Sequence, residues 1–549
     1  MPGFPPLIGR GMNRQNKLSG SDGQGETVSS TDMRASLASI YDVIILYEIT
    51  ECGLKQKITL LHNPFYIQAV TPEQQSVCKR VFIILPDNDI FSAHPQMLPP
   101  FFPHPHTTPL LQQNNYKNNK ITVYQFPVHC YYKYIKTQDN QRRKHMISER
   151  FYGIGEPLIQ RERDTHVPAA EYLDLVKALG CTAYRSWMHL TEILKDPLTP
   201  DKEAVSAHTE LLDRAVELDL EVTGMSHEWF LPEGCIQHTG HAVPRRDLTK
   251  GSLYRQTLEM LAQSWFTMVS LFPQVSQWEV GNEWNINAFL QPDGFLDSDM
   301  SEPFSPEEKL DIAVDLMYFA AKGIRRANPN AKVVSFSPAL STPWLGGNLP
   351  DFLPPMYGIA WTLDKIYSRI RSGKFWSTDP DDYFDLVAWH PYQMSTCQDK
   401  RDADLFLHIE EPDHLWKDYN DAAYRVMCKY GDAGKQVILT ETGFTDCGDP
   451  KLEKMQAEYT RKLLQLAGEL PYVRTIYNFR LLTETGMLEK QGIEKNQIGG
   501  RAEVYFGFFE EPHKNCRPRL KAYVLQEAAG GHEDLAAAGK KVALLRKKS

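Results

Sequence analysis

The sequence predicts an α/β fold, a (β/α)8 barrel, with a poorly patterned N-terminal extension before it. From about residue 150 onward, short apolar segments typical of strands alternate with longer segments in which apolar residues recur every three or four positions. Eight strand segments can be counted in this region, and their regular alternation with helices is typical of a closed parallel barrel. A doubly wound open sheet is the structural rival, but no GxGxxG turn accompanies the strands.

The predicted elements follow one another along residues 150–479. The clearest helix begins at Ser305, which is suited to cap it, with Pro306 in the first turn and Glu308 completing a capping box. Asn328 and Pro329 end this helix. The predicted strands are 150–155, 181–187, 221–229, 277–283, 332–338, 384–392, 436–441 and 473–479. The predicted helices are 168–180, 208–220, 253–272, 305–327, 415–430 and 451–469.

Composition divides the chain near residue 146. Residues 1–145 lack periodicity and contain a stretch rich in Pro, His and Asn, which is typical of a largely disordered or loosely structured extension. The barrel is expected over 146–530, and a basic tail over 531–549. A basic run at 142–145 precedes Met146, which is a candidate for the true start of the chain.

Charge and cysteine content narrow the classes of partner. With 60 Lys and Arg against 69 Asp and Glu, the net charge of −9 gives no reason to expect nucleic acid or an anionic membrane. No apolar run reaches the roughly 18 residues of a membrane span, and no signal-peptide core is seen. The localisation is therefore open, with a cytoplasmic protein as the default and a secreted one if the start is misassigned. The nine scattered cysteines form no CxxC pair, and His104 and His106 have no further ligands beside them, so no metal is expected.

Two glutamates end predicted strands, which is where barrels carry their chemistry. In the segment WEVGNE, alternation places Glu279 and Glu283 on one face, with Glu283 at the inward rim. In VILTE, the same count places Glu441 with Val437 and Leu439. One such glutamate is more often a solvated or capping residue, but two in unusual surroundings indicate chemistry. Two facing carboxylates serve glycosidic cleavage, since one protonates the leaving oxygen while the other attacks the sugar or activates water.

The segments GNEW (281–284) and TETGF (440–444) resemble the paired signatures of clan A glycoside hydrolases, which are retaining TIM-barrel glycosidases. The resemblance covers about residues 149–529. It implies that Glu283 is the acid/base, that Asn282 contacts the sugar 2-hydroxyl and that Glu441 is the nucleophile, with the carboxyl groups about 5 to 5.5 Å apart. It also implies an oligosaccharide or polysaccharide substrate, such as a β-linked glucan, mannan or xylan or a small β-glycoside, and no metal or organic cofactor.

Further residues fit this resemblance. Arg185 in YRSW matches the arginine that holds the nucleophile, although a surface ion-pair role is its ordinary alternative. In AWHPY, His390 and Tyr392 share a face and resemble the clan's His-x-Tyr pair, whose tyrosine hydroxyl forms a hydrogen bond with the nucleophile. The alternative is a structural role, in which both side chains pack under loops. His227 is a candidate pocket residue, and Trp284 is a candidate for stacking on sugar.

Several of these candidates also have plain structural explanations. A lone histidine on an apolar strand, such as His227 before Glu228, is usually a satisfied structural residue. For any one tryptophan, including Trp284, core packing is the better expectation. The further tryptophan candidates are Trp187, Trp229 and Trp344.

The chain departs from the clan's pattern at the eighth strand. Many members end it with a tryptophan, whereas here Tyr477, Phe479 and Arg480 stand in that region, and Arg519 occupies a later position where proline is common. The sugar, the linkage and the family within the clan therefore stay unassigned. A transglycosylase would use the same residues and is separated by product analysis with an added acceptor. A non-catalytic carbohydrate-binding barrel would have no need for an acid, a nucleophile and their orienting groups together.

Overall fold

The structure is a computed structural model of the 549-residue chain. It describes residues 151–546, with gaps at 237–239, 287–288, 295–302, 340–357, 393–410, 447 and 485–503, and only short strands before residue 151. Trp344, His104, His106 and Met146 lie outside the described residues. The chain divides into two compact units, one of which is Ile8–His145 and the other of which holds 1–7 and 146–549.

The described strands of the Ile8–His145 unit pair antiparallel. β5 (Arg80–Pro86), β7 (Asn119–Pro127) and β6 (Gln112–Tyr116) form a sheet in the order β5-β7-β6. These strands were not predicted from the sequence, and the loose structure expected over 1–145 stays a prediction. The remaining pairs are β1 (Ile44–Leu46) with β4 (Thr59–Leu61) and β2 (Ile49–Thr50) with β3 (Gly53–Leu54).

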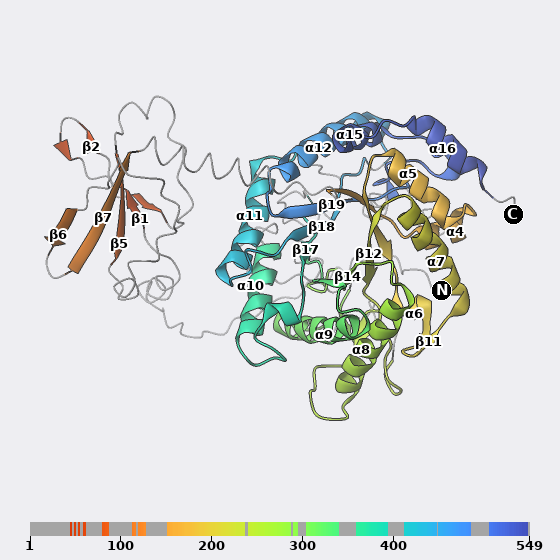
Figure 1. Ribbon diagram of the computed structural model, residues 1–549, viewed down its shortest axis with the longest axis horizontal. Coiled ribbons are helices and arrows are strands. Elements are labelled where there is room, and N and C mark those ends of the chain that lie inside the picture. The colour runs from red at the N-terminus through yellow and green to blue at the C-terminus, as the bar shows by residue number, and fades with distance from the viewer. Residues whose placement is uncertain are drawn as a thin grey trace, which may run out of the picture. The chain divides into compact units, whose positions relative to one another are not determined.

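Eight parallel strands form the barrel of the second unit, with helices around them (Figure 1). Neighbours in the sequence are neighbours in the sheet, and the last strand pairs with the first. A parallel bridge between Val334 and Leu386 closes the remaining seam. The predicted barrel is thus confirmed. Its strands are β8 (Tyr152–Gly155), β9 (Ala183–Trp187), β12 (Glu221–Ser226), β14 (Gln277–Val280), β16 (Lys332–Val334), β17 (Val387–Trp389), β18 (Val437–Thr442) and β19 (Val473–Phe479).

The six predicted helices are all present, with shifted ends. The helix capped by Ser305 is confirmed in detail, because the Ser305 hydroxyl accepts a hydrogen bond from the Glu308 amide at 3.2 Å. The helices are α4 (Leu158–Thr165), α5 (Leu173–Ala178), α6 (Leu190–Ile193), α7 (Lys202–Glu217), α8 (Leu253–Leu271), α9 (Pro306–Ala327), α10 (Gly358–Arg371), α11 (His414–Lys429), α12 (Pro450–Gly468), α15 (Leu520–Ala529) and α16 (Leu535–Leu544). The shorter pieces are η1 (Ala169–Tyr172), η4 (Pro380–Asp382), η6 (Pro512–Lys514), β10 (Leu194–Asp196), β11 (Thr199–Pro200), β13 (Ala242–Val243) and β15 (Gln291–Pro292). Of these helices, α4, α6, α10, α15 and α16 were not predicted. Among the described residues, no helix is long and apolar enough to cross a bilayer.

The interior of the barrel is filled by side chains, as barrels of this size require. Tyr477 occupies the space that Gly153 leaves free, since a Cβ at Gly153 would lie 2.6 Å from the tyrosine ring. The Tyr477 hydroxyl shares a 2.7 Å hydrogen bond with Thr223, which also accepts one from Gln277 at 2.7 Å. The apolar residues inside the barrel are Ala183, Val334, Leu386, Ala388, Ile438 and Tyr477.

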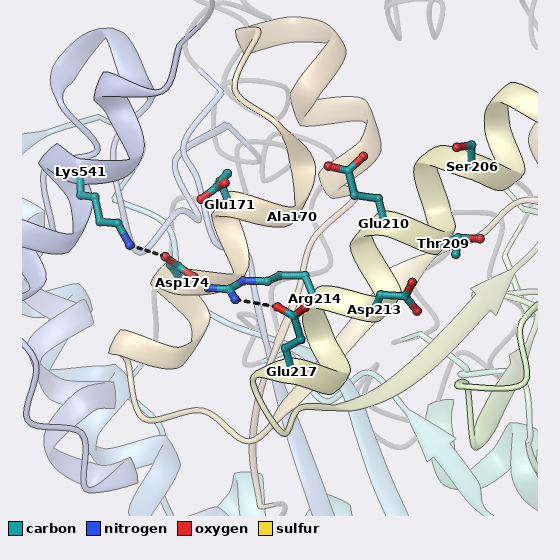
Figure 2. Close-up of a pocket in the computed structure, with 10 residues that line it drawn as sticks. All are labelled: Ala170, Glu171, Asp174, Ser206, Thr209, Glu210, Asp213, Arg214, Glu217 and Lys541. Atoms are coloured by element: carbon teal, nitrogen blue, oxygen red, sulfur yellow. Dashed lines mark hydrogen bonds and ion pairs between the residues drawn. The ribbon is translucent and has the colours of Figure 1, made fainter.

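The basic tail contains α16, for which the sequence analysis predicted no structure. Its Leu535 and Val542 are buried, and Lys541 donates to Asp174 at 2.8 Å while Arg214 donates to the other oxygen of Asp174 at 2.6 Å (Figure 2). These contacts join α16, α5 and α7 around an open hollow on the outer ring of helices. Because exposed ion pairs contribute about 1 kcal/mol or less, the buried leucine and valine are the main anchors of α16. The hollow also has acidic lining residues, namely Glu171, Glu210, Asp213 and Glu217.

The contact between α8 and α9 depends on Gly323. A Cβ at Gly323 would lie 2.2 Å from the backbone oxygen of Ala262, so a larger residue must push the two helices apart. We expect Gly323→Ala to lower the free energy of unfolding by about 1–3 kcal/mol. Gly468, which ends α12, has nothing within 4 Å of the same position, so Gly468→Ala should be neutral or stabilise by up to about 1 kcal/mol. Chemical denaturation measures both changes, and equal effects would contradict the close approach of α8 and α9.

Candidate active site

Arg185 lies at the C-terminal end of the barrel with its side chain fully buried. Its Nε and Nη2 donate to the two oxygens of Glu279 at 2.5 and 3.1 Å, and its Nη1 donates to Glu441 at 2.6 Å. The planar guanidinium suits this paired recognition of carboxylates. Burial alone would lower the pKa of Arg185, but the charges of Glu279 and Glu441 outweigh it and raise the pKa, so the arginine stays charged.

Both oxygens of the Glu441 carboxylate receive hydrogen bonds. Oε1 accepts from Arg185, and Oε2 accepts from the hydroxyl of Tyr392 at 3.0 Å. Burial favours the protonated form, but the charges of His390 and Arg185 and these hydrogen bonds outweigh burial and lower the pKa of Glu441. Glu441 is therefore held as a carboxylate.

The orientation of Glu441 does not arise as the alternation of the sequence predicted. Val437 and Leu439, which were expected to share its face, pack in the core shared with the helices, while Ile438 points into the barrel. The pairing of β18 with β19 shifts register between Leu439 and Thr442. Because a shift of one residue exchanges the two faces of a strand, Glu441 can point toward Arg185.

Glu283 has a different environment from Glu441. His390 Nδ1 lies 2.7 Å from Oε1 of Glu283, and 3.8 Å from Oε2 of Glu441. Burial raises the pKa of Glu283, and the negative charge of Glu441 adds to this, although the hydrogen bond and charge of His390 oppose it. Burial likewise works against the charged form of His390, but Glu441 and Glu283 outweigh it and raise its pKa. The pair of Glu283 and His390 therefore retains a proton more readily than either group would in water.

Backbone turns, rather than strand alternation, bring Glu283 into this position. β14 ends at Val280, and the next residues include Gly281 with φ +89° and Glu283 with φ +50°, in the left-handed region. The Glu283 amide donates to the carbonyl of Ser337 at 2.9 Å, and Asn282 forms a parallel bridge with Ser337. Asn282 also accepts a hydrogen bond from Arg185 at 3.2 Å through its side-chain oxygen.

Trp284 packs under the turn rather than facing the two glutamates. A Cβ at Gly281 would lie 2.2 Å from the Trp284 ring, so glycine is required there both by φ and by this contact. The ring stacks on Phe336 at 5.5 Å and meets Trp229 edge-on at 5.9 Å. Since Trp284 is 2% exposed, it offers no face on which a sugar can stack, and it fixes the shape of the turn instead.

The other aromatic candidates differ in exposure. Trp229 is buried, whereas Trp187 at the end of β9 is half-buried, with its ring 4.7 Å from the guanidinium carbon of Arg185 and 6.4 Å from the ring of Phe479. His227 is 7% exposed and contacts the ring of His189 at 4.4 Å. Of these residues, Trp187 is the one that lies beside Arg185 and keeps part of its side chain exposed.

Three residues that support the site were not predicted as part of it. Glu279 accepts hydrogen bonds from Nε and Nη2 of Arg185, and its Oε1 also accepts a hydrogen bond from Ser337. The Ser337 hydroxyl in turn lies 2.5 Å from that of Thr440 on β18. Strand alternation places Glu279 on the same face as Glu283, and this pattern could have identified Glu279 as a site residue. The roles of Ser337 and Thr440 depend on contacts between strands that are distant in the sequence.

The arrangement suits acid/base and nucleophilic chemistry. One atom each of Glu283, His390 and Glu441 lies within 4.8 Å of the others, a spacing that a cation could also bridge. However, both oxygens of Glu441 already accept hydrogen bonds, one of them from the permanent cation of Arg185. A carboxylate kept ionised beside a carboxyl group that retains a proton is the pairing expected of a nucleophile and a general acid.

No protein family matches the chain, and no curated protein matches it either. Solved structures to which the chain is similar include GH5_18 from Streptomyces cattleya in complex with GlcNAc, at 16% identity and a TM-score of 0.45, covering 70% of this chain and 80% of that one. An exo-beta-1,4-mannosidase from Opitutaceae bacterium strain TAV5 is similar at 14% identity and 0.44, covering 69% and 59%. A xylanase from Thermotoga petrophila RKU-1 is similar at 15% identity and 0.42, covering 70% and 97%. At these values the likeness does not indicate an activity, which has to follow from the site.

The buried charge of Arg185 makes a strong prediction for stability. Arg185→Met leaves Glu279 and Glu441 buried without their cation, so we expect the free energy of unfolding at neutral pH to fall by about 3–5 kcal/mol. Because buried unpaired carboxylates take up protons, the deficit should shrink as the pH falls toward about 4. Urea denaturation across this range measures the effect.

A matched control for that variant is Arg245→Met. Arg245 is 49% exposed and pairs with Glu308 at 3.0 Å, so its loss should cost about 1 kcal/mol or less. Similar losses in the two variants would contradict the central role of Arg185.

Proposed function

We propose that the protein is a retaining glycoside hydrolase that cleaves β-linked O-glycosides of an oligosaccharide or polysaccharide. The observation that carries the proposal is the unequal environment of the two glutamates, with Arg185 and Tyr392 on Glu441 and His390 on Glu283. Their closest oxygens lie within 4.8 Å. This spacing supports the retaining mechanism, because inverting enzymes separate the two carboxyl groups by about 6.5–9.5 Å to admit a water molecule.

In the first step Glu441 attacks the anomeric carbon of the sugar. Glu283 donates its proton to the glycosidic oxygen, the bond between that oxygen and the anomeric carbon breaks, and a glycosyl ester of Glu441 forms. Arg185 and Tyr392 hold Glu441 ionised and aimed, since each donates to one carboxylate oxygen. Asn282, fixed by Arg185 through its oxygen, has its amide N–H groups to offer to a sugar hydroxyl.

In the second step Glu283 acts as a base. It removes a proton from a water molecule, whose oxygen attacks the anomeric carbon; the ester bond breaks and the Glu441 carboxylate is restored. His390, within hydrogen-bond distance of Glu283 and closer to it than to Glu441, holds Glu283 in place during both proton transfers. The half-buried ring of Trp187 is the described aromatic surface on which a sugar would stack.

Covalent labelling tests the nucleophile directly. The full-length protein is incubated with 2-deoxy-2-fluoro glycosyl fluorides of the gluco, manno and xylo series, and its peptides are mapped by mass spectrometry. We expect one sugar to label the peptide that contains Glu441. The fluorine at C2 slows both steps, but fluoride is a good leaving group and keeps the first step fast enough for the glycosyl ester to accumulate. Labelling elsewhere, or none in a folded protein that hydrolyses the parent glycoside, would refute the assignment.

Substitution of the nucleophile gives a second prediction. Glu441→Gln removes the attacking carboxylate but keeps its shape, so turnover of an aryl glycoside should fall by about three orders of magnitude or more. The surface variant Glu259→Gln, which alters an exposed glutamate of α8, should leave turnover unchanged. Near-normal activity of Glu441→Gln would exclude Glu441 as the nucleophile.

The pH dependence should be bell-shaped. Glu283 has to be protonated and its pKa is raised, so activity is present below that pKa and is lost as the pH rises through it. Glu441 has to be ionised and its pKa is lowered, so activity is lost as the pH falls through that value. In Glu283→Gln, kcat/KM for an activated aryl glycoside should lose the alkaline limb, whereas an unchanged alkaline limb would assign that titration to another group.

A further inference from the structure

A second cluster of chemically active side chains lies after the second and third strands of the barrel. His189 follows β9, and His227 and Glu228 follow β12. One possible ligand atom from each of these three residues lies within 4.8 Å of the others. The ring of His241, which precedes β13, lies 4.6 Å from that of His227, so three imidazoles and one carboxylate meet at this point.

Two ring nitrogens in the cluster are buried without a partner. Nδ1 of His189 and Nδ1 of His227 have no hydrogen-bond partner among the residues that the structure describes, and His227 is 7% exposed. A buried polar atom without a partner costs free energy that a folded protein usually avoids. The geometry therefore leaves a place for a group that interacts with imidazole nitrogen.

The cluster combines two kinds of metal ligand. His189 and His227 offer imidazole nitrogens, which are the commonest protein ligands of transition metal ions. Glu228 contributes a carboxylate, which is positioned by a hydrogen bond from the Thr191 hydroxyl to its Oε2.

We propose that His189, His227 and Glu228 bind a divalent transition metal ion, for which zinc is the natural candidate. Zinc prefers imidazole nitrogen with carboxylate oxygen at about 2.0–2.2 Å, so the side chains need only close around the ion. Calcium and magnesium are disfavoured because they take oxygen ligands. His241 is a further imidazole at the same place and a candidate fourth ligand.

The metal would join the segments that follow β9 and β12, through residues other than the two glutamates. The Ser226 hydroxyl, one residue before His227, accepts a hydrogen bond from the Leu190 amide, one residue after His189, at 3.1 Å, so these segments already touch. The site is independent of the proposed hydrolysis. It also differs from the expectation of no metal, which considered the cysteines and the His-Pro-His segment.

Metal binding by the untagged full-length protein tests the proposal. The protein is stripped with a chelator and titrated with zinc against a chromophoric competitor, and bound metal is counted after desalting. The variants are His189→Gln and Glu228→Gln, with His414→Gln as the control, since His414 is 77% exposed at the start of α11. We expect the parent and the control to bind one more zinc per chain than the two cluster variants, or to bind it about 100-fold more tightly or better.

The comparison of variants decides the outcome even if histidines elsewhere in the chain bind zinc, because only the difference counts. Circular dichroism establishes that each variant is folded; His189 and Glu228 are both half-buried, so both substitutions are expected to be tolerated. Cobalt in place of zinc should give visible absorption bands of a nitrogen and oxygen site of low coordination number, lost in both cluster variants. Equal zinc content and affinity in all four proteins, or no binding by the folded parent, would overturn the proposal.

Discussion

The buried guanidinium of Arg185 is the constraint on which the rest of the site depends. A cation with no exposed surface has to be neutralised, and three strands of the barrel cooperate in this, with Arg185 on β9, Glu279 on β14 and Glu441 on β18. Glu279 accepts hydrogen bonds from two nitrogens of the guanidinium, whereas Glu441 accepts from only one, so Glu279 fixes the arginine while Glu441 keeps an oxygen for Tyr392. The inequality of the two candidate catalytic glutamates follows from this division, since Arg185 donates to Glu441, whereas the side-chain partner of Glu283 among the described residues is His390.

Much of the fold and the two candidate catalytic glutamates could be predicted from the sequence, because periodicity and helix capping are local properties. The eight strands and the helix capped by Ser305 are recognisable within short windows, and Glu283 and Glu441 stand out by their neighbours. What could not be predicted depends on contacts across the barrel. The register shift in β18 and the positive φ of Glu283 both overturn simple alternation, yet each brings its glutamate to the expected end of the barrel. The hydrogen bonds of Ser337 with Glu279 and Thr440 likewise could not be predicted from the sequence.

The same face of the barrel holds two groups of ionisable side chains with opposite electrostatic properties. Around Arg185, positive and negative side chains stabilise one another, and Glu441 is kept ionised despite its burial. Around His227, burial and the charges of His189, His241 and Arg185 lower the pKa of the imidazole and favour its neutral form. Proximity to Arg185 acts on both groups, since it lowers the pKa of the glutamate and of the histidine alike. One buried cation therefore favours the ionised form of a carboxylate and the neutral form of an imidazole.

The fit of Tyr477 over Gly153 has a consequence for how the chain is made. Asn478, beside this tyrosine, donates to the carbonyl of Gly153 across 325 residues of sequence, so the first strand emerges from the ribosome long before its partner exists. β8 is therefore synthesised well before β19, with which it pairs in the closed barrel. Glu279 is synthesised in this interval, whereas Glu441 follows near the end. The order of translation thus delivers the residue that secures the arginine before the carboxylate that the arginine keeps ionised.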